Sequence, residues 1–214
     1  MHKKEIYWID RVIIINMEVE NMIKGTRTAE NLMKSFAGEC QARTRYTYYS
    51  SIAKKEGYVQ IANIFMETAE QEKEHAKRFF KFLKNEYNGD AIEIEAGYPV
   101  ALYDETLMNL KAAASGEHEE WSKDYPEFAR IAREEGFIDI AVAYERIAEV
   151  EKRHEKRYLK LLKNIESNSV FKKDEVVLWK CNNCGYIFEG EEAPKVCPAC
   201  LHPQGYFEVF IENY

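Results

Sequence analysis

Acidic residues and histidines recur along the chain in a pattern that can hold two metal ions. The set is Glu39, Glu72, His75, Glu117, Glu151 and His154. Residues three apart share one face of a helix, so each Glu-x-x-His pair can point at one ion. Two such pairs and two further glutamates form the ligand set of helical bundles that bind two metals. We therefore predict a site for two metal ions.

The donor types indicate iron or manganese. Carboxylates can bridge two cations, and imidazole adds nitrogen ligands. Two adjacent metals can deliver two electrons together, as the reduction of a peroxide requires. The alternative is that these charges lie on solvated helix faces. However, Glu39 lies between Phe36 and Tyr46 on a face expected to be buried, and a buried carboxylate without a partner is costly.

Three further residues are expected at this site. Glu120 follows Glu117 by three residues, whereas the equivalent position in the first half of the chain is Ala42. One metal would thus have an extra carboxylate that the other lacks. Tyr46 and Tyr125 occupy equivalent positions, and we expect each to donate a hydrogen bond to a ligating carboxylate. Aromatic core packing is the alternative role for both tyrosines.

A second metal site is predicted near the C-terminus. Two Cys-x-x-Cys loops supply the four thiolates of Cys181, Cys184, Cys197 and Cys200. Four thiolates form a tetrahedron suited to zinc or to one iron. A structural zinc ribbon is the alternative. Iron is favoured by context, because a two-metal redox site in the same chain needs a supply of electrons.

Helical periodicity places these residues on four helices. We expect helices at 26–56, 58–86, about 104–124 and 137–165, with Pro126 restarting or kinking the third. Residues 87–100 lack helical periodicity and are too many for a tight turn. This arrangement predicts a mainly α fold, a four-helix bundle with a long crossover between helices two and three.

The two halves of the predicted bundle are related in sequence. The motif at 72–79 reappears at 151–158, an offset of 79 residues, and Ala-Gly-Glu at 37–39 matches Ser-Gly-Glu at 115–117, an offset of 78. Two related helical hairpins predict a pseudo-two-fold axis. A site built from both halves would lie on that axis.

Composition excludes several classes of protein. The 214 residues carry a net charge of −7 with 46% hydrophobic residues, which is typical of a globular protein and gives no electrostatic grip on nucleic acid. The apolar run at 12–15 is too short to cross a membrane or to act as a signal peptide. Clustered cysteines favour a reducing compartment, and we expect a cytoplasmic protein.

The motifs together resemble the rubrerythrin family. The resemblance is carried by residues 39–46, by 116–120, by both Glu-x-x-His elements and by 179–203, and it covers roughly 22–212. It implies a ferritin-like four-helix bundle followed by a small rubredoxin-like β/loop domain. The expected boundaries are an N-terminal extension of unknown role at 1–21, the ferritin-like di-iron domain at 22–166, a linker at 167–175 and the rubredoxin-like domain at 176–214.

The resemblance also implies a function. Members are NADH-linked peroxidases in which a non-haem di-iron centre reduces hydrogen peroxide to water, and electrons return through a rubredoxin-type Fe(Cys)4 centre. One iron moves between a histidine and a glutamate, at positions that match His75 and Glu120. Members form head-to-tail or domain-swapped dimers, and we expect this chain to form such a homodimer or a homotetramer. The sequence has no Gly-x-Gly-x-x-Gly nicotinamide fingerprint, so the expected donor is an external NAD(P)H-dependent reductase or a rubredoxin.

Two other functions remain open at this stage. The bundle alone also suits a ferroxidase or another iron-handling protein, and the thiolate site also suits a non-enzymatic electron-transfer protein. The chain departs from the family at Cys40, where serine is usual and where we expect a small buried residue. It departs again at residues 1–16, which have no counterpart in typical members.

Overall fold

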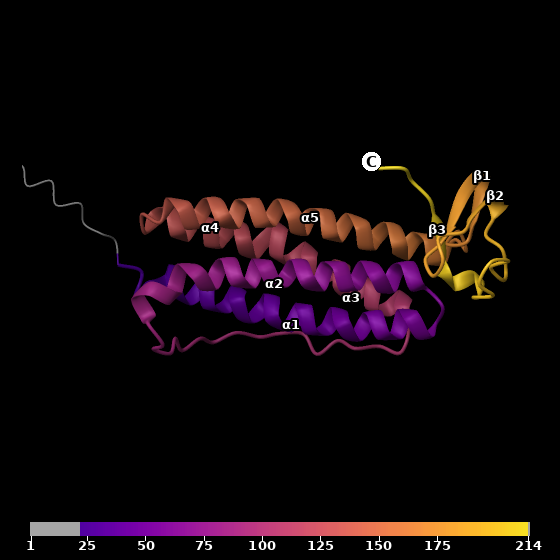
Figure 1. Cartoon of the computed structure of the whole chain (residues 1–214). Coiled ribbons are helices and arrows are strands. Elements are labelled where there is room, and N and C mark those ends of the chain that lie inside the picture. Colours follow the sequence, from indigo (N-terminus) through magenta and orange to yellow (C-terminus); the bar gives the residue numbers. More distant parts are fainter. Residues whose placement is uncertain (1–21, 214) are drawn as a thin grey trace, which may run out of the picture.

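The computed structural model describes residues 22–213. Long helices lie side by side along one axis (Figure 1). They are α1 (Arg27–Lys55), α2 (Val59–Tyr87), α3 (Thr106–Glu119), α4 (Tyr125–Glu134) and α5 (Ile138–Glu166). A five-residue π-helix, η1 (Glu120–Asp124), joins α3 to α4. These three consecutive elements together form the third helix of a four-helix bundle. The predicted extension at 1–21 lies outside the described residues.

The third helix of the bundle continues beyond the predicted end at residue 124. It runs through η1 and on to Glu134, so Pro126 lies in the first turn of α4. Proline has no N–H to donate to the preceding turn, and the π-helical turn directly before it, in which the Tyr125 N–H donates to the Glu120 carbonyl, is the place where the regular helical bonding changes. The predicted restart at this proline is confirmed, and a π-helical turn accompanies it.

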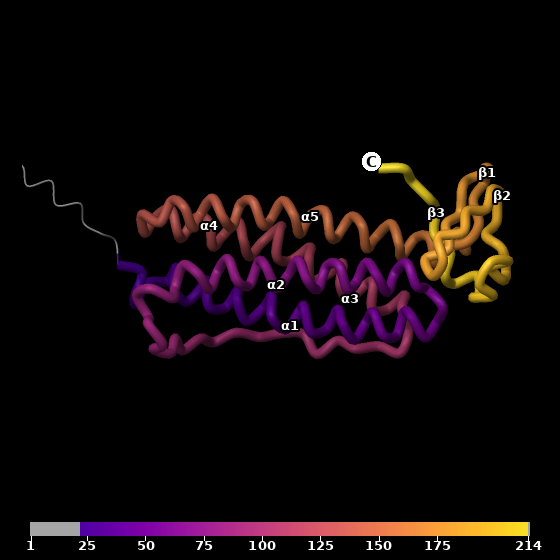
Figure 2. Tube along the Cα trace, in the orientation of Figure 1, coloured from indigo at the N-terminus to yellow at the C-terminus, as the bar shows by residue number. Residues whose placement is uncertain are grey.

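The predicted crossover is also confirmed. Between the end of α2 and the start of α3 the chain runs extended beside α1, over nearly its whole length (Figure 2). Two tyrosine hydroxyls hold it there: Tyr98 donates to the Lys34 carbonyl at 2.9 Å, and Tyr49 donates to the Ala101 carbonyl at 2.6 Å. The crossover therefore forms a wall of the bundle, and it covers the side where α1 faces α3.

The two halves cap each other's helices. The carboxylate of Glu135, after α4, accepts hydrogen bonds from the Thr28 backbone N–H at 2.9 Å and hydroxyl at 2.6 Å. Glu56, after α1, accepts from the Thr106 backbone N–H at 2.7 Å. Both satisfy N–H groups that a helix leaves open at its start. The sequence repeat is thus a structural pseudo-symmetry.

Two apolar clusters fill the bundle. One contains Tyr46, Phe65, Leu110 and Tyr158 at the end near the α1–α2 turn, and the other contains Leu32, Phe79, Tyr125 and Tyr144 towards the opposite end. Aromatic rings make up much of both, with centroids 4.8 to 6.1 Å apart. Because aromatic side chains bury large areas in fixed orientations, these clusters hold the helices rigidly around whatever lies between them.

The C-terminal residues form a small antiparallel sheet. It contains β1 (Lys172–Cys181), β2 (Ile187–Glu192) and β3 (Phe207–Val209) in the order β2-β1-β3, with a short 3₁₀ turn at Gln204–Tyr206. Trp179 is fully buried, and its indole N–H donates to the Gly190 carbonyl at 2.9 Å. Because β1 begins at Lys172, the last part of the predicted linker 167–175 belongs to this sheet instead.

The sheet domain packs on the end of the bundle at the α1–α2 turn (Figure 1). The rings of Tyr58 and Phe171 stack at 6.1 Å with an interplanar angle of 4°. Gly205 sits so close to this turn that a Cβ there would lie 2.2 Å from the Gly57 carbonyl oxygen. Only glycine fits this contact. None of the described helices combines the length and apolarity needed to cross a membrane.

Candidate metal centres

The structure brings the six predicted carboxylate and histidine ligands together, midway along the bundle. They form two overlapping groups, in each of which one donor atom per residue lies within 4.8 Å of the others. The first group is Glu39, Glu72, His75 and Glu151, and the second is Glu72, Glu117, Glu151 and His154. We call these six residues the paired site. Glu72 and Glu151 belong to both groups and are therefore placed to bridge two ions.

Distances within the paired site support this bridging arrangement. His75 Nδ1 lies 2.9 Å from Glu72 Oε2 and 2.9 Å from Glu151 Oε1. His154 Nδ1 lies 2.8 Å from Glu151 Oε2 and 3.2 Å from Glu72 Oε1. Each shared carboxylate thus turns one oxygen toward each histidine. Each i, i+3 pair faces inward, as its spacing predicted.

Several ligand atoms make no well-oriented hydrogen bond within residues 22–213, although some of them lie 2.8 to 3.2 Å from one another. They are Glu39 Oε2, Glu72 Oε1, Glu117 Oε2, both oxygens of Glu151, and His154 Nδ1. The four glutamates are at most 2% exposed. A buried polar group left unpaired costs roughly 1–3 kcal/mol, and more when it is charged. One cation in each of the two groups of four residues would give all these atoms a partner. The residues present therefore fit a pair of metal ions.

The pKa shifts of the buried glutamates also indicate that the paired site lacks positive charge when no metal is bound. Burial, followed by repulsion from Glu72, raises the pKa of Glu39 well above its ordinary value and that of Glu117 to about 8. Burial also acts to raise the pKa of Glu72, but hydrogen bonds with His154 and His75 outweigh it and lower the value to about 2. Burying four carboxylates together is therefore unfavourable in the metal-free protein.

Both predicted tyrosine hydrogen bonds are present, and each joins the two halves. The Tyr46 hydroxyl donates to Glu117 Oε1 at 2.5 Å, and the Tyr125 hydroxyl donates to Glu39 Oε1 at 2.5 Å. Both rings are about 2% exposed. Each bond leaves one oxygen of its glutamate free for a metal and fixes the carboxylate plane. This is how buried hydrogen bonds orient metal ligands.

Glu120 lies beside the paired site but in neither group of four. Burial raises its pKa well above the ordinary value, and the charge of Glu117 adds to this effect. It begins η1, where one extra residue is accommodated in the helix. The repeat offset changes from 78 at Glu117 to 79 at Tyr125 within this same segment. The π-helix is therefore the structural form of a one-residue insertion beside Glu120.

Sequence reasoning missed Gln71. Its side-chain oxygen lies 2.9 Å from His154 Nε2, and this bond leaves His154 Nδ1 directed at the paired site. The position equivalent to Gln71 in the repeat is Val150, which offers His75 no such bond. His75 also keeps 14% of its side chain exposed, against 5% for His154. The comparison of positions 71 and 150 was the available signal.

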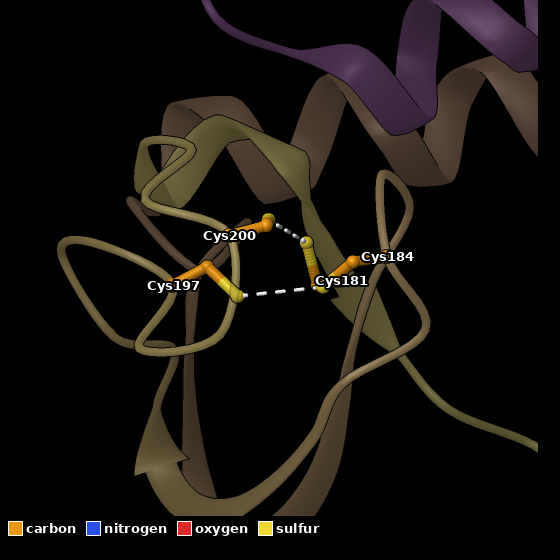
Figure 3. Close-up of side chains that lie close together, drawn as sticks. All are labelled: Cys181, Cys184, Cys197 and Cys200. Atoms are coloured by element: carbon orange, nitrogen blue, oxygen red, sulfur yellow. Dashed lines mark hydrogen bonds between the residues drawn. The ribbon is translucent and has the colours of Figure 1, made fainter.

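The four cysteines meet in the sheet domain, as Figure 3 shows. Cys181 Sγ lies 3.7 Å from Cys200 Sγ, and Cys184 Sγ lies 3.7 Å from Cys197 Sγ. A tetrahedron with metal–sulfur bonds of about 2.3 Å has edges of roughly 3.7 Å. The four sulfurs, which we call the thiolate site, are therefore spaced for one tetrahedral ion.

The loops of the thiolate site have the geometry that thiolates need. Gly185 has φ = 79° and Leu201 has φ = 61°, so both loops turn back after the second cysteine. The His202 backbone N–H donates to Cys200 and lowers its pKa to about 6. Amide donors of this kind stabilise the deprotonated form that binds a metal. Cys40, by contrast, is exposed on α1, so the expectation of a buried residue there was wrong.

Comparison with known proteins gives two family matches. Residues 30–162 match the model of the rubrerythrin family, and residues 179–208 match that of the rubrerythrin rubredoxin-like domain. Rubrerythrin of Clostridium perfringens is 69% identical over 192 residues, covering 90% of this chain and 98% of that protein. Rubrerythrin of Nitratidesulfovibrio vulgaris is 50% identical with the same coverage.

Solved structures agree with these matches. Fully reduced nigerythrin superposes with a TM-score of 0.59 at 29% identity, covering 96% of this chain and all of that one. A bacterioferritin of Desulfovibrio desulfuricans has a TM-score of 0.59 at 25% identity, covering 66% of this chain and 81% of that one. The predicted ferritin-like bundle, rubredoxin-like domain, di-iron Glu/His site and four-cysteine centre are thereby confirmed. The chain belongs to the rubrerythrin family.

Proposed function

We propose that this protein is a peroxidase that reduces hydrogen peroxide to water. The observation that supports the proposal best is the presence of two metal sites of different kinds in one chain. The paired site has the ligands of a two-electron centre, and the thiolate site has those of a one-electron carrier. An iron-handling protein needs only the first, and an electron carrier needs only the second.

The reaction requires two electrons and two protons for each hydrogen peroxide converted to two waters. When bound, a ferrous pair supplies both electrons. The protein supplies positions from which protons can move. The hydroxyls of Tyr46 and Tyr125 carry protons at the edge of the paired site. Burial raises the pKa of Glu120 well above its usual range, which favours the protonated form of this carboxyl and suits it to hold a proton beside the site.

We propose unequal roles for the two histidines. His154 is held from behind by Gln71 and is 5% exposed, whereas His75 has Val150 at the equivalent position and is 14% exposed. His75 is thus the ligand with more freedom to disengage, and Glu120 is a further buried carboxylate near Glu117, Glu151 and Glu39. This supports the exchange between His75 and Glu120 that the family resemblance implies.

We propose that a second copy of the chain delivers the electrons. Glu72 lies thirteen residues along α2 from Val59, where the sheet domain packs. At about 1.5 Å per residue, the paired site lies roughly 20 Å along the bundle from this end of α2, and the thiolate site of the same chain lies in the sheet domain beyond that end. We propose a head-to-tail homodimer in which the rubredoxin-like domain of the second copy sits beside the paired site. Residues 176–214 carry five glutamates and two lysines, and α5 exposes Lys152, Arg153 and Lys156 near the site, which gives an acidic domain basic side chains to contact.

The test is anaerobic reduction followed by rapid mixing. We expect the reduced protein to be oxidised by hydrogen peroxide much faster than by dioxygen, with two electrons leaving the paired site for each peroxide consumed. Sedimentation should show a dimer or tetramer. Oxidation by dioxygen at an equal or higher rate, or assembly into a large cage, would instead favour the iron-handling function.

A further inference from the structure

We propose that the oxidant reaches the paired site through a cavity beneath the crossover segment, and that two helical glycines keep this cavity open to small polar hydroperoxides. The inference rests on the proposed peroxidase function and extends it to substrate access. The cavity, which we call the crossover cavity, has a volume of about 220 Å³. Residues 95–99 of the crossover cover it, and α1 and α3 form its sides.

The inner end of the crossover cavity adjoins the metal ligands. Glu120 and Tyr125 line it, and the Tyr125 hydroxyl donates directly to Glu39. A molecule in the cavity is therefore one hydrogen bond from the paired site. The ligands are otherwise largely enclosed within residues 22–213, since the four glutamates are at most 2% exposed, the His154 side chain 5% and the His75 side chain 14%.

Two glycines, Gly38 and Gly116, lie on the helices at the sides of the cavity. They directly precede Glu39 and Glu117 and are equivalent in the repeat. Neither has a positive φ. A Cβ on Gly38 would stand 3.6 Å from the Tyr98 ring, and one on Gly116 would stand 4.0 Å from Arg45 Nη2.

Backbone conformation therefore does not require glycine at either position, and an added methyl group would clash with nothing. Glycine inside a helix is nevertheless about 1 kcal/mol less favourable than alanine. What it provides at both positions is empty space in the cavity.

The lining favours a polar guest. Arg45 lines the cavity, and its buried Nε has no hydrogen-bond partner within the described residues. Gln41, Ser35 and Glu120 add further polar groups. Since liquid water occupies about 30 Å³ per molecule, a cavity of this size holds one small hydroperoxide with a few waters. Such walls can hydrogen-bond hydrogen peroxide, whereas dioxygen gains little from them.

The first test fills the cavity. We compare Gly116→Leu with Ser115→Leu, an exposed neighbour on the same helix, and measure oxidation of the reduced protein by hydrogen peroxide and by tert-butyl hydroperoxide. Gly116→Leu should slow oxidation by hydrogen peroxide about tenfold or more, with iron content unchanged, while Ser115→Leu should match the wild type. The wild type should react much more slowly with the bulky peroxide. An unchanged rate in a metal-loaded Gly116→Leu protein would overturn the proposal.

The second test needs neither metal turnover nor peroxide. Thiols are introduced by Gly116→Cys or, as the control, by Ser115→Cys, and peptide mass spectrometry follows each cysteine separately. A small methanethiosulfonate should label both positions, whereas a bulky maleimide should label position 116 at least about tenfold more slowly than position 115. The proposal predicts a difference between the two positions with the bulky maleimide only. If the maleimide labelled both positions at the same rate, or if neither reagent labelled position 116, no such passage would exist. If hydrogen peroxide does not oxidise the reduced wild type, the proposed peroxidase function is wrong. The labelling experiment does not depend on that activity, so it still tests whether the cavity is an access route.

Discussion

The hydroxyl of Tyr46, on the first helix of one half, donates a 2.5 Å hydrogen bond to Glu117, on the first helix of the other half. Tyr125 returns the same bond to Glu39. The metal ligands of each half are thus oriented by the opposite half. A change in one hairpin is expected to reach both halves of the paired site, because each tyrosine stabilises a carboxylate that lies across the pseudo-two-fold axis.

Removing a tyrosine hydroxyl should destabilise the metal-free protein more than the metal-loaded one. In Tyr125→Phe, Glu39 loses its hydrogen-bonded partner while remaining buried, which costs roughly 1–3 kcal/mol. A bound cation offsets part of that cost. Thermal denaturation of both forms measures the difference, with Tyr48→Phe as the control because Tyr48 is 50% exposed. A larger loss in the loaded protein would contradict the assigned role.

Replacing Glu120 should separate metal binding from turnover. Because Glu120 belongs to neither group of four ligands, Glu120→Gln is expected to retain close to the normal iron content. Its reaction with hydrogen peroxide should slow by about 10²-fold or more, the usual size of a proton-transfer contribution. Iron analysis and stopped-flow mixing provide the two measurements. Loss of iron together with activity would make Glu120 a structural ligand.

Deleting one residue from the π-helix should be tolerated, unlike the same deletion in a regular helix. Removing Ser122 from η1 restores the seven-residue spacing that separates Glu39 from Tyr46 in α1. Removing Thr44 from α1 turns every following side chain by about 100°. We expect the first variant to fold with a melting temperature near the wild type and the second to lose most of its stability. Circular dichroism during heating compares them.

The metal-free protein should lose stability as pH rises from about 5 to 8. Burial raises the pKa of Glu117 from 4.5 to about 8, so the folded state holds a proton that the unfolded chain releases. Burial acts to lower the pKa of His154, but the hydrogen bonds that its ring donates to neighbouring carboxylates raise it from 6.5 to about 12. This shift acts in the same direction above pH 6.5. Urea titrations at several pH values measure the slope, and Glu117→Gln should flatten it below pH 8.

Breaking the thiolate site should stop turnover without abolishing the first reaction with peroxide. Cys197→Ser removes one of the four sulfurs of the thiolate site. Small metal-binding domains unfold when their ion is lost, so the sheet domain should lose its structure. The chemically reduced variant should still react once with hydrogen peroxide at the paired site. It should then fail to be reduced again by its electron donor. Sustained turnover at the normal rate would remove the thiolate site from the electron path.

Sequence reasoning located the elements of this protein whose signal is local or repeated. Helical periodicity, the Glu-x-x-His spacing and the doubled motif identified the six residues that meet in the paired site and both tyrosines that bond to its glutamates. It failed where contacts join distant positions. Nothing local marks Glu56 or Glu135 as helix caps, and the start of β1 at Lys172 depends on pairing with β2. The π-helix did leave a trace, the change of offset from 78 to 79.

The reciprocal caps have a further consequence. Glu56 of the first half completes the start of α3, and Glu135 of the second half completes the start of α1. A hairpin isolated from its counterpart would lack both the cap and half of the ligands. Two identical copies of one hairpin, however, would each provide what the other needs. The pseudo-symmetry is thus the arrangement expected of an ancestral homodimer of half-length chains that was later joined by the crossover.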